Sequence, residues 1–111
     1  MLWPLSDRRS SQRIPVSLRV QYRSSSTVLD GVVEDLSRGG MFIATDSLDV
    51  LGADAAIDLE LPGDGKVQLR GEVVRIEHDR RKGLGIRIAR DDEARRPLAN
   101  FMMKSAFWNR D

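Results

Sequence analysis

The feature that most restricts the fold of this chain is the alternation of apolar and polar residues in several short stretches. From Val16 to Arg23 every second residue is apolar, and the same period recurs in residues 55–61 and 83–88. A period of two places the apolar side chains on one face of a β-strand and the polar ones on the other. The pattern therefore predicts half-buried strands over most of the chain.

Turn signals separate these stretches from further apolar segments. Additional strands are expected at residues 28–36, 41–45 and 67–77. Near the C-terminus the apolar spacing changes to three to four, which predicts a terminal helix of about 92–108 with Asp91 or Asp92 as its cap. Pro97 costs a helix an internal hydrogen bond unless it lies in the first turn, so the helix is expected to start between Asp91 and Arg96.

Six short strands joined by turns and followed by one helix are typical of an antiparallel barrel whose open end is closed by the helix. Gly71, in the middle of the longest stretch, suggests a bulge or the sharp bend where a barrel turns a corner. A chain of 111 residues has the size of one compact domain. We predict an all-β fold, a six-stranded antiparallel β-barrel with a C-terminal α-helix, preceded by a short tail at residues 1–7.

The composition excludes several functional classes. The chain has no cysteine and one histidine, His78, which removes disulfides, thiolate catalysis and cysteine-based zinc sites. The motifs HExxH, GxSxG and GKS/T are absent. We therefore expect no catalytic residue, no metal and no cofactor, and predict that the chain is not an enzyme. No apolar run approaches the roughly 18 residues of a membrane span and no signal-peptide core is present, which favours a cytoplasmic protein without membrane insertion.

Positive charge is concentrated at the start of the chain. The net charge is +1, yet residues 1–29 contain five arginines and a single acid. Fifteen of the 18 basic residues are arginine, whose planar fork suits phosphate groups and guanine edges. A local patch of this kind favours a small anionic ligand over a long polyanion. Arginine-rich codon usage and a solvated basic tail are the simpler alternatives.

Two short clusters contain the candidate ligand contacts. Arg9 and Arg13 lie just before the first strand, close enough for both guanidinium groups to reach one diphosphate-sized anion. Asp35 and Ser37 are two residues apart where the second strand ends, which places a carboxylate and a hydroxyl on the same face. Both residue types also make backbone caps and turns, which is the alternative reading of this cluster. The turn that follows contains two glycines, Gly39 and Gly40.

Taken in order, Arg9-x-x-x-Arg13 followed by Asp35-x-Ser37-x-x-Gly40 resembles the paired signature of the PilZ family. The stretches at 71–76 and 83–88 and the closing helix resemble the late strands and the helix of the same family, so the resemblance covers roughly residues 8–108. It implies a PilZ-like barrel domain at 8–111 that binds cyclic di-GMP, with a binding arm at residues 8–15.

The resemblance also implies roles for the signature residues. Arg9 and Arg13 would hold phosphates and the guanine Hoogsteen edge, and Asp35 and Ser37 would hold guanine donors and acceptors. Gly40, with Gly39 beside it, would leave room for the ligand at the barrel wall. These roles agree with the chemistry of the side chains, because arginine presents a two-pronged donor to guanine O6 and N7 whereas aspartate accepts from guanine N–H groups.

Arg8 directly precedes the signature. In the PilZ family an arginine at this position is associated with capture of two mutually intercalated ligand molecules per protomer, its plane stacking on an outer guanine. The resemblance further implies an effector protein as partner, or a change from monomer to ligand-dependent dimer.

Two other functions compete with this one. The first is a PilZ-like adaptor that acts through protein contacts without nucleotide binding. The second is weak binding of single-stranded nucleic acid, which would need aromatic residues gathered on the sheet face. The six aromatic side chains are scattered along the sequence, so no DNA binding is expected.

Overall fold

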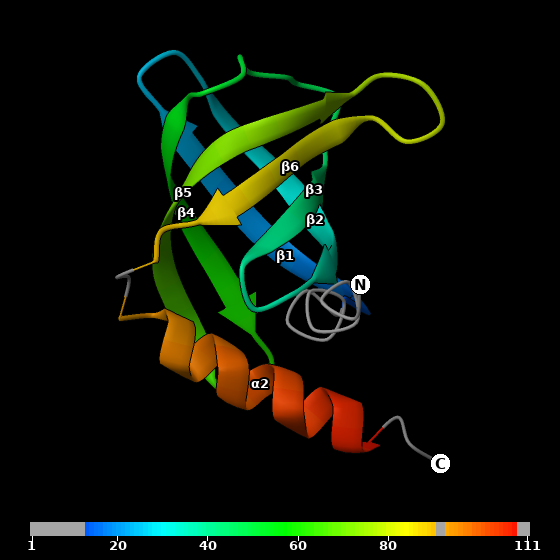
Figure 1. Cartoon of the computed structure of the whole chain (residues 1–111), viewed down its shortest axis with the longest axis vertical. Coiled ribbons are helices and arrows are strands. Elements are labelled where there is room, and N and C mark those ends of the chain that lie inside the picture. Colours follow the sequence, from blue (N-terminus) through cyan, green and yellow to red (C-terminus); the bar gives the residue numbers. More distant parts are fainter. Residues whose placement is uncertain (1–12, 91–92, 109–111) are drawn as a thin grey trace, which may run out of the picture.

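A computed structural model describes residues 13–90 and 93–108 of the chain (Figure 1). Within that part there are six strands and one helix. The strands are β1 (Ile14–Ser24), β2 (Val28–Leu36), β3 (Gly40–Ala44), β4 (Asp54–Leu61), β5 (Gly65–Glu77) and β6 (Gly83–Ile88), and the helix is α2 (Arg95–Trp108). The predicted six-stranded antiparallel barrel with a C-terminal helix is confirmed.

The strands form a closed barrel in the order β1-β2-β3-β6-β5-β4, and β4 pairs back onto β1. Closure gives every strand of the described barrel a partner on both sides over part of its length. The long strand β5 makes closure possible, because its first part pairs with β4 and its later part with β6. At Gly71 it is paired on both sides, opposite Ala55 and Ile88. A Cβ at Gly71 would lie 2.6 Å from Cγ2 of Ile86, so the glycine allows β5 to pass close to β6.

Gly71 was expected to mark a bulge or the bend where the barrel turns a corner. The register between β5 and β6 shifts between Val73 and Arg75, so the bulge is not at the glycine, but β5 changes from pairing with β4 to pairing with β6 around Gly71. The start of β1 also differs from the expected residue 16, because Ile14 and Pro15 already pair with the end of β2. Residues 14–15, assigned to the arm from the sequence, are therefore part of the barrel. A register shift in the pairing with β2 lies between Pro15 and Leu18, although the alternation of more and less buried residues continues back to Ile14.

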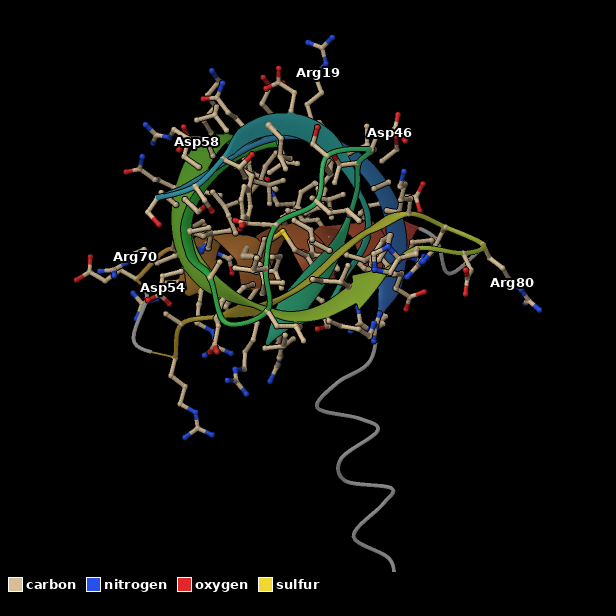
Figure 2. All side chains as sticks on the ribbon, turned by 90° about the horizontal axis from the view of Figure 1, so that it is seen from above. Arg19, Asp46, Asp54, Asp58, Arg70 and Arg80 are labelled. Carbon is tan, nitrogen blue, oxygen red and sulfur yellow. The ribbon has the colours of Figure 1, made fainter. Side chains whose placement is uncertain are left out.

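The barrel interior is filled by the apolar residues that alternate along the strands. In β1, for example, Leu18, Val20 and Tyr22 are buried while the residues between them are exposed. Figure 2 looks along the barrel and shows charged side chains such as Arg19 and Asp58 pointing outward. The period of two seen in the sequence thus separates the core from the outer surface.

Helix α2 lies across one end of the barrel (Figure 1). Leu98 of α2 is 1% exposed and belongs to the barrel core. Phe101 and Met102, also on α2, are partly buried and pack against this core. The helix begins at Arg95, within the range predicted from the sequence, and Pro97 lies in its first turn. The expected caps, Asp91 and Asp92, lie outside the described residues. Within the described part of the chain, no helix has the length and apolar character needed to cross a membrane.

The loop between β3 and β4 covers the opposite end of the barrel and is anchored by Asp49, which is 9% exposed. Its carboxylate accepts hydrogen bonds from the hydroxyls of Tyr22 (2.5 Å), Ser24 (2.6 Å) and Ser26 (2.9 Å) and from the backbone N–H of Val50 (2.8 Å). Burial raises the pKa of Asp49, but the hydrogen bonds together outweigh it and lower the pKa to about 2. Burial and the neighbouring carboxylate raise the pKa of Tyr22 far above its ordinary value.

Candidate functional site

The turn that joins β2 to β3 is held by Ser37. The backbone N–H of Ser37 donates to the carbonyl of Gly40 (2.8 Å), and the backbone N–H of Gly40 donates to the Ser37 hydroxyl oxygen (3.1 Å). The Ser37 hydroxyl also donates to the Gly40 carbonyl at 3.3 Å, and Ser37 is 4% exposed. Ser37 therefore makes the backbone cap considered from the sequence, and its direct contact with a ligand stays a prediction.

The two glycines of this turn have different surroundings. A Cβ at Gly40 would lie 2.3 Å from the carbonyl oxygen of Ile86, so only glycine lets β3 approach β6 at this point. A Cβ at Gly39 would meet nothing within 4 Å. The barrel wall itself therefore requires glycine at position 40, and the predicted room for a ligand beside it stays a prediction.

Asp35 lies at the end of β2 and is held by two arginines. Arg13 donates to one carboxylate oxygen, although 22 residues separate the two side chains in sequence. Arg81, from the hairpin between β5 and β6, donates to the other oxygen at 3.1 Å. The Asp35 side chain keeps an exposed fraction of 15%. The structure therefore brings the second arginine of the RxxxR motif onto the aspartate of the second cluster, as the ligand-site hypothesis requires.

Arg8 and Arg9 lie outside the described residues. Their predicted positions beside the ligand are therefore untested, and the described part of the site consists of Arg13, Asp35, Ser37 and the glycine turn.

Arg81, in the segment between β5 and β6, was not among the candidate ligand contacts predicted from the sequence. Its guanidinium carbon lies 3.7 Å from the centroid of the Phe42 ring. Phe42 is fully buried yet lies outside the interior cluster that contains its neighbours Met41 and Ile43. Its ring therefore packs on the outer side of the barrel wall, beneath Arg81.

The outer position of Phe42 depends on glycines in β6. Phe42 pairs with Gly85, and a Cβ at Gly83 would lie 2.7 Å from Cζ of the ring. A Gly-x-Gly stretch opposite an aromatic residue in a predicted strand was the available signal. No sequence signal pointed to the contact between Phe42 and Arg81, because these two residues come together only when β3 packs against β6.

The site offers cationic donors and a carboxylate acceptor side by side. The two arginines leave 46% (Arg13) and 41% (Arg81) of their side chains exposed beside a partly exposed carboxylate. Guanidinium groups bind phosphate oxygens and guanine O6 and N7, and a carboxylate accepts from guanine N–H donors. Among the described residues no group of His, Asp and Glu is placed to hold a metal ion.

The turn of the site is also linked to the terminal helix. Arg95, the first residue of α2, donates to the carbonyl of Arg38 at 3.0 Å. The backbone between Ser37 and Gly40 is thus joined to the start of α2 by a hydrogen bond.

Solved structures with similar folds include the Bacillus subtilis inhibitor of motility MotI/DgrA, with a TM-score of 0.77 and 18% sequence identity. That similarity covers 94% of this chain but 54% of MotI/DgrA, so the chain spans about half the length of that protein. A second structure is the PilZ domain of CeSA from a cellulose-synthesizing bacterium, with a TM-score of 0.57 and 26% identity over 73% of this chain and 84% of that domain.

Among curated protein sequences, none matches this chain. The family model of the PilZ domain matches residues 7–104, which is most of the sequence and includes every strand of the barrel. This chain therefore belongs to the PilZ domain family, a family of cyclic di-GMP receptor and adaptor domains.

Proposed function

We propose that this protein is a receptor for cyclic di-GMP that carries out no chemistry, needs no cofactor and signals to an effector protein. The observation that supports this most directly is the contact between Arg13 and Asp35, which joins the two halves of the signature. A basic segment and a carboxylate at one corner of a barrel match the mixed chemistry of a guanine dinucleotide, which offers phosphates together with N–H donors.

In this proposal the signature residues act on different parts of the ligand. Arg9 and Arg13 bind the phosphates and the Hoogsteen edge of guanine, and Asp35 accepts from the guanine N–H donors. Ser37 holds the turn that carries this corner, and Gly40 keeps the wall of the barrel close beside it.

Ligand binding is then an exchange of partners. The Arg13 guanidinium that pairs with Asp35 in the free protein must turn, at least in part, towards the phosphates. The charge-assisted hydrogen bonds that Arg13 makes to the phosphates offset the loss of this ion pair. Because these contacts are ionic and partly exposed, affinity should fall as the salt concentration rises.

Isothermal titration calorimetry with cyclic di-GMP tests the proposal. Wild type should bind, and R9A and R13A should each bind about tenfold more weakly or worse, because each loses a charge-assisted bond. R19A is the matched control, since Arg19 is an exposed arginine of β1 that points outward from the barrel (Figure 2). The proposal fails if wild type gives no heat, or if R9A and wild type have equal affinity.

The stoichiometry of the same titration tests the role of Arg8. We propose two intercalated ligand molecules per protomer, the plane of Arg8 stacking on an outer guanine. A ratio of one in wild type would remove that role while leaving the receptor function intact. Light scattering with and without ligand then distinguishes a protein that stays monomeric from one that dimerises when the ligand binds.

A further inference from the structure

The guanidinium group of Arg81 lies over the Phe42 ring, and 41% of the Arg81 side chain is exposed. We propose that the face turned away from the ring is a stacking platform for a purine base of the bound nucleotide, so that the ligand site extends beyond the signature to Arg81 and Phe42. The inference rests on the proposed function, because the base in question belongs to the same ligand.

Three contacts fix the plane of Arg81. The guanidinium carbon lies 3.7 Å from the centroid of the Phe42 ring. One terminal nitrogen lies 3.1 Å from a carboxylate oxygen of Asp35, and the other lies 3.7 Å from a carboxylate oxygen of Glu34. An arginine fixed in this way has already lost most of its rotamer freedom, so stacking on it costs the ligand little additional ordering.

Burial indicates which face is available. Phe42 is fully buried on the outer wall of the barrel, so one face of the guanidinium is in contact with the ring that it covers. The Arg81 side chain nevertheless keeps 41% of its surface exposed. The proposal assigns that exposed surface to the face of the guanidinium turned away from Phe42.

The N–H groups of Arg81 favour a base over a phosphate as the partner. One terminal nitrogen donates to Asp35 and the other lies within ion-pair distance of Glu34, so two carboxylates already offset the charge that would hold a phosphate. A planar cation whose edge is occupied still attracts the π face of an aromatic ring. The chemical class that fits is therefore a flat aromatic base.

Arg81 does not need to leave Asp35 for this to occur. An ionised carboxylate offers about four lone-pair positions, and Arg81 donates to only one of the two oxygens. Once Arg13 has turned to the phosphates, the other oxygen is free to accept from guanine. A nucleotide that meets Asp35 with a base edge then has a base within reach of the face of Arg81 turned away from the ring.

Titration of cyclic di-GMP into R81K, R81A and R80A separates stacking from charge. R81K keeps the charge and reaches Asp35 but lacks the plane, so the proposal predicts that R81K and R81A both lose roughly tenfold or more in affinity. R80A removes the same charge from the neighbouring residue, which points away from the barrel (Figure 2), and should stay within about twofold of wild type. Thermal unfolding of each variant confirms that the barrel is intact.

A second measurement needs no variant. In a proton NMR titration of wild type, the Arg81 side-chain resonances should shift upfield as ligand is added, because a stacked base adds its ring current to that of Phe42. If R81K binds as wild type does, or if these resonances do not move at saturation, Arg81 is only a structural cover for Phe42 and the inference is wrong while the receptor function stands. If wild type does not bind at all, both proposals fall.

Discussion

Replacing Asp49 with asparagine should destabilise the barrel and flatten its response to acid. The carboxylate is 9% exposed and accepts four hydrogen bonds, three of them from side-chain hydroxyls. Folding lowers its pKa from 3.8 to about 2, which corresponds to roughly 2 kcal/mol of stability near neutral pH. D49N keeps the shape of the side chain but lacks the charge, so it should lose about that amount.

The pH dependence follows from the direction of the shift. Because folding lowers the pKa of Asp49, its contribution is present in full above about pH 4 and is lost as the pH falls towards about 2. Urea unfolding followed by circular dichroism at a series of pH values measures the free energy of unfolding that D49N loses and the slope of that free energy against pH. Between about pH 4 and pH 2 the stability of wild type should fall more steeply than that of D49N.

Asp46 provides the matched control for this experiment. It lies in the same loop, is exposed and points outward (Figure 2), so D46N should change stability by no more than about 0.5 kcal/mol. The reasoning is refuted if D49N is as stable as wild type near neutral pH, or if the two proteins lose stability in parallel through the acid range.

Three further substitutions test how the barrel wall and its helix are held. G40A should cost about 1–3 kcal/mol because its Cβ would lie 2.3 Å from a backbone oxygen of β6, whereas G39A should be tolerated; equal thermal stability of the two would contradict the required close approach. L98A removes the fully buried anchor of α2 and should cost about 2–5 kcal/mol in urea unfolding, and a smaller loss would mean that the helix adds little to the core. K104A breaks an exposed ion pair of 2.9 Å with Asp64 and should change stability by less than about 1 kcal/mol, with a larger loss indicating that the pair holds the helix in place.

The strand pattern could be read from the sequence wherever alternation was continuous. β2 and β6 begin and end at the predicted residues because apolar periodicity and turn residues agree there. At the start of β1 the alternation runs back to Ile14, but residues 14–15 were assigned to the arm and their pairing with β2 was not foreseen. Near Gly71 the glycine allows close strand approach, and the register shift lies beyond it. Local patterns therefore located the strands but not the places where the barrel bends.

The candidate site was predictable to a similar degree. The meeting of Arg13 and Asp35 followed from an ordered motif on expected elements. The engagement of the Ser37 hydroxyl by its own turn was one of two readings that the sequence left open. Arg81 could not be found in advance, because its contact with Asp35 joins residues 46 positions apart and depends on the path of a hairpin that the sequence describes only as charged.

The hydrogen bond from the Arg95 side chain to the carbonyl of Arg38 connects the glycine turn with the first residue of α2. When the turn moves, this exposed side chain either follows the carbonyl or loses the bond, at a cost of about 1 kcal/mol. In the proposed receptor, a rearrangement of the turn around a nucleotide would therefore redirect or release the Arg95 side chain. The surface at the N-terminal end of α2 would then differ between the two states of the turn.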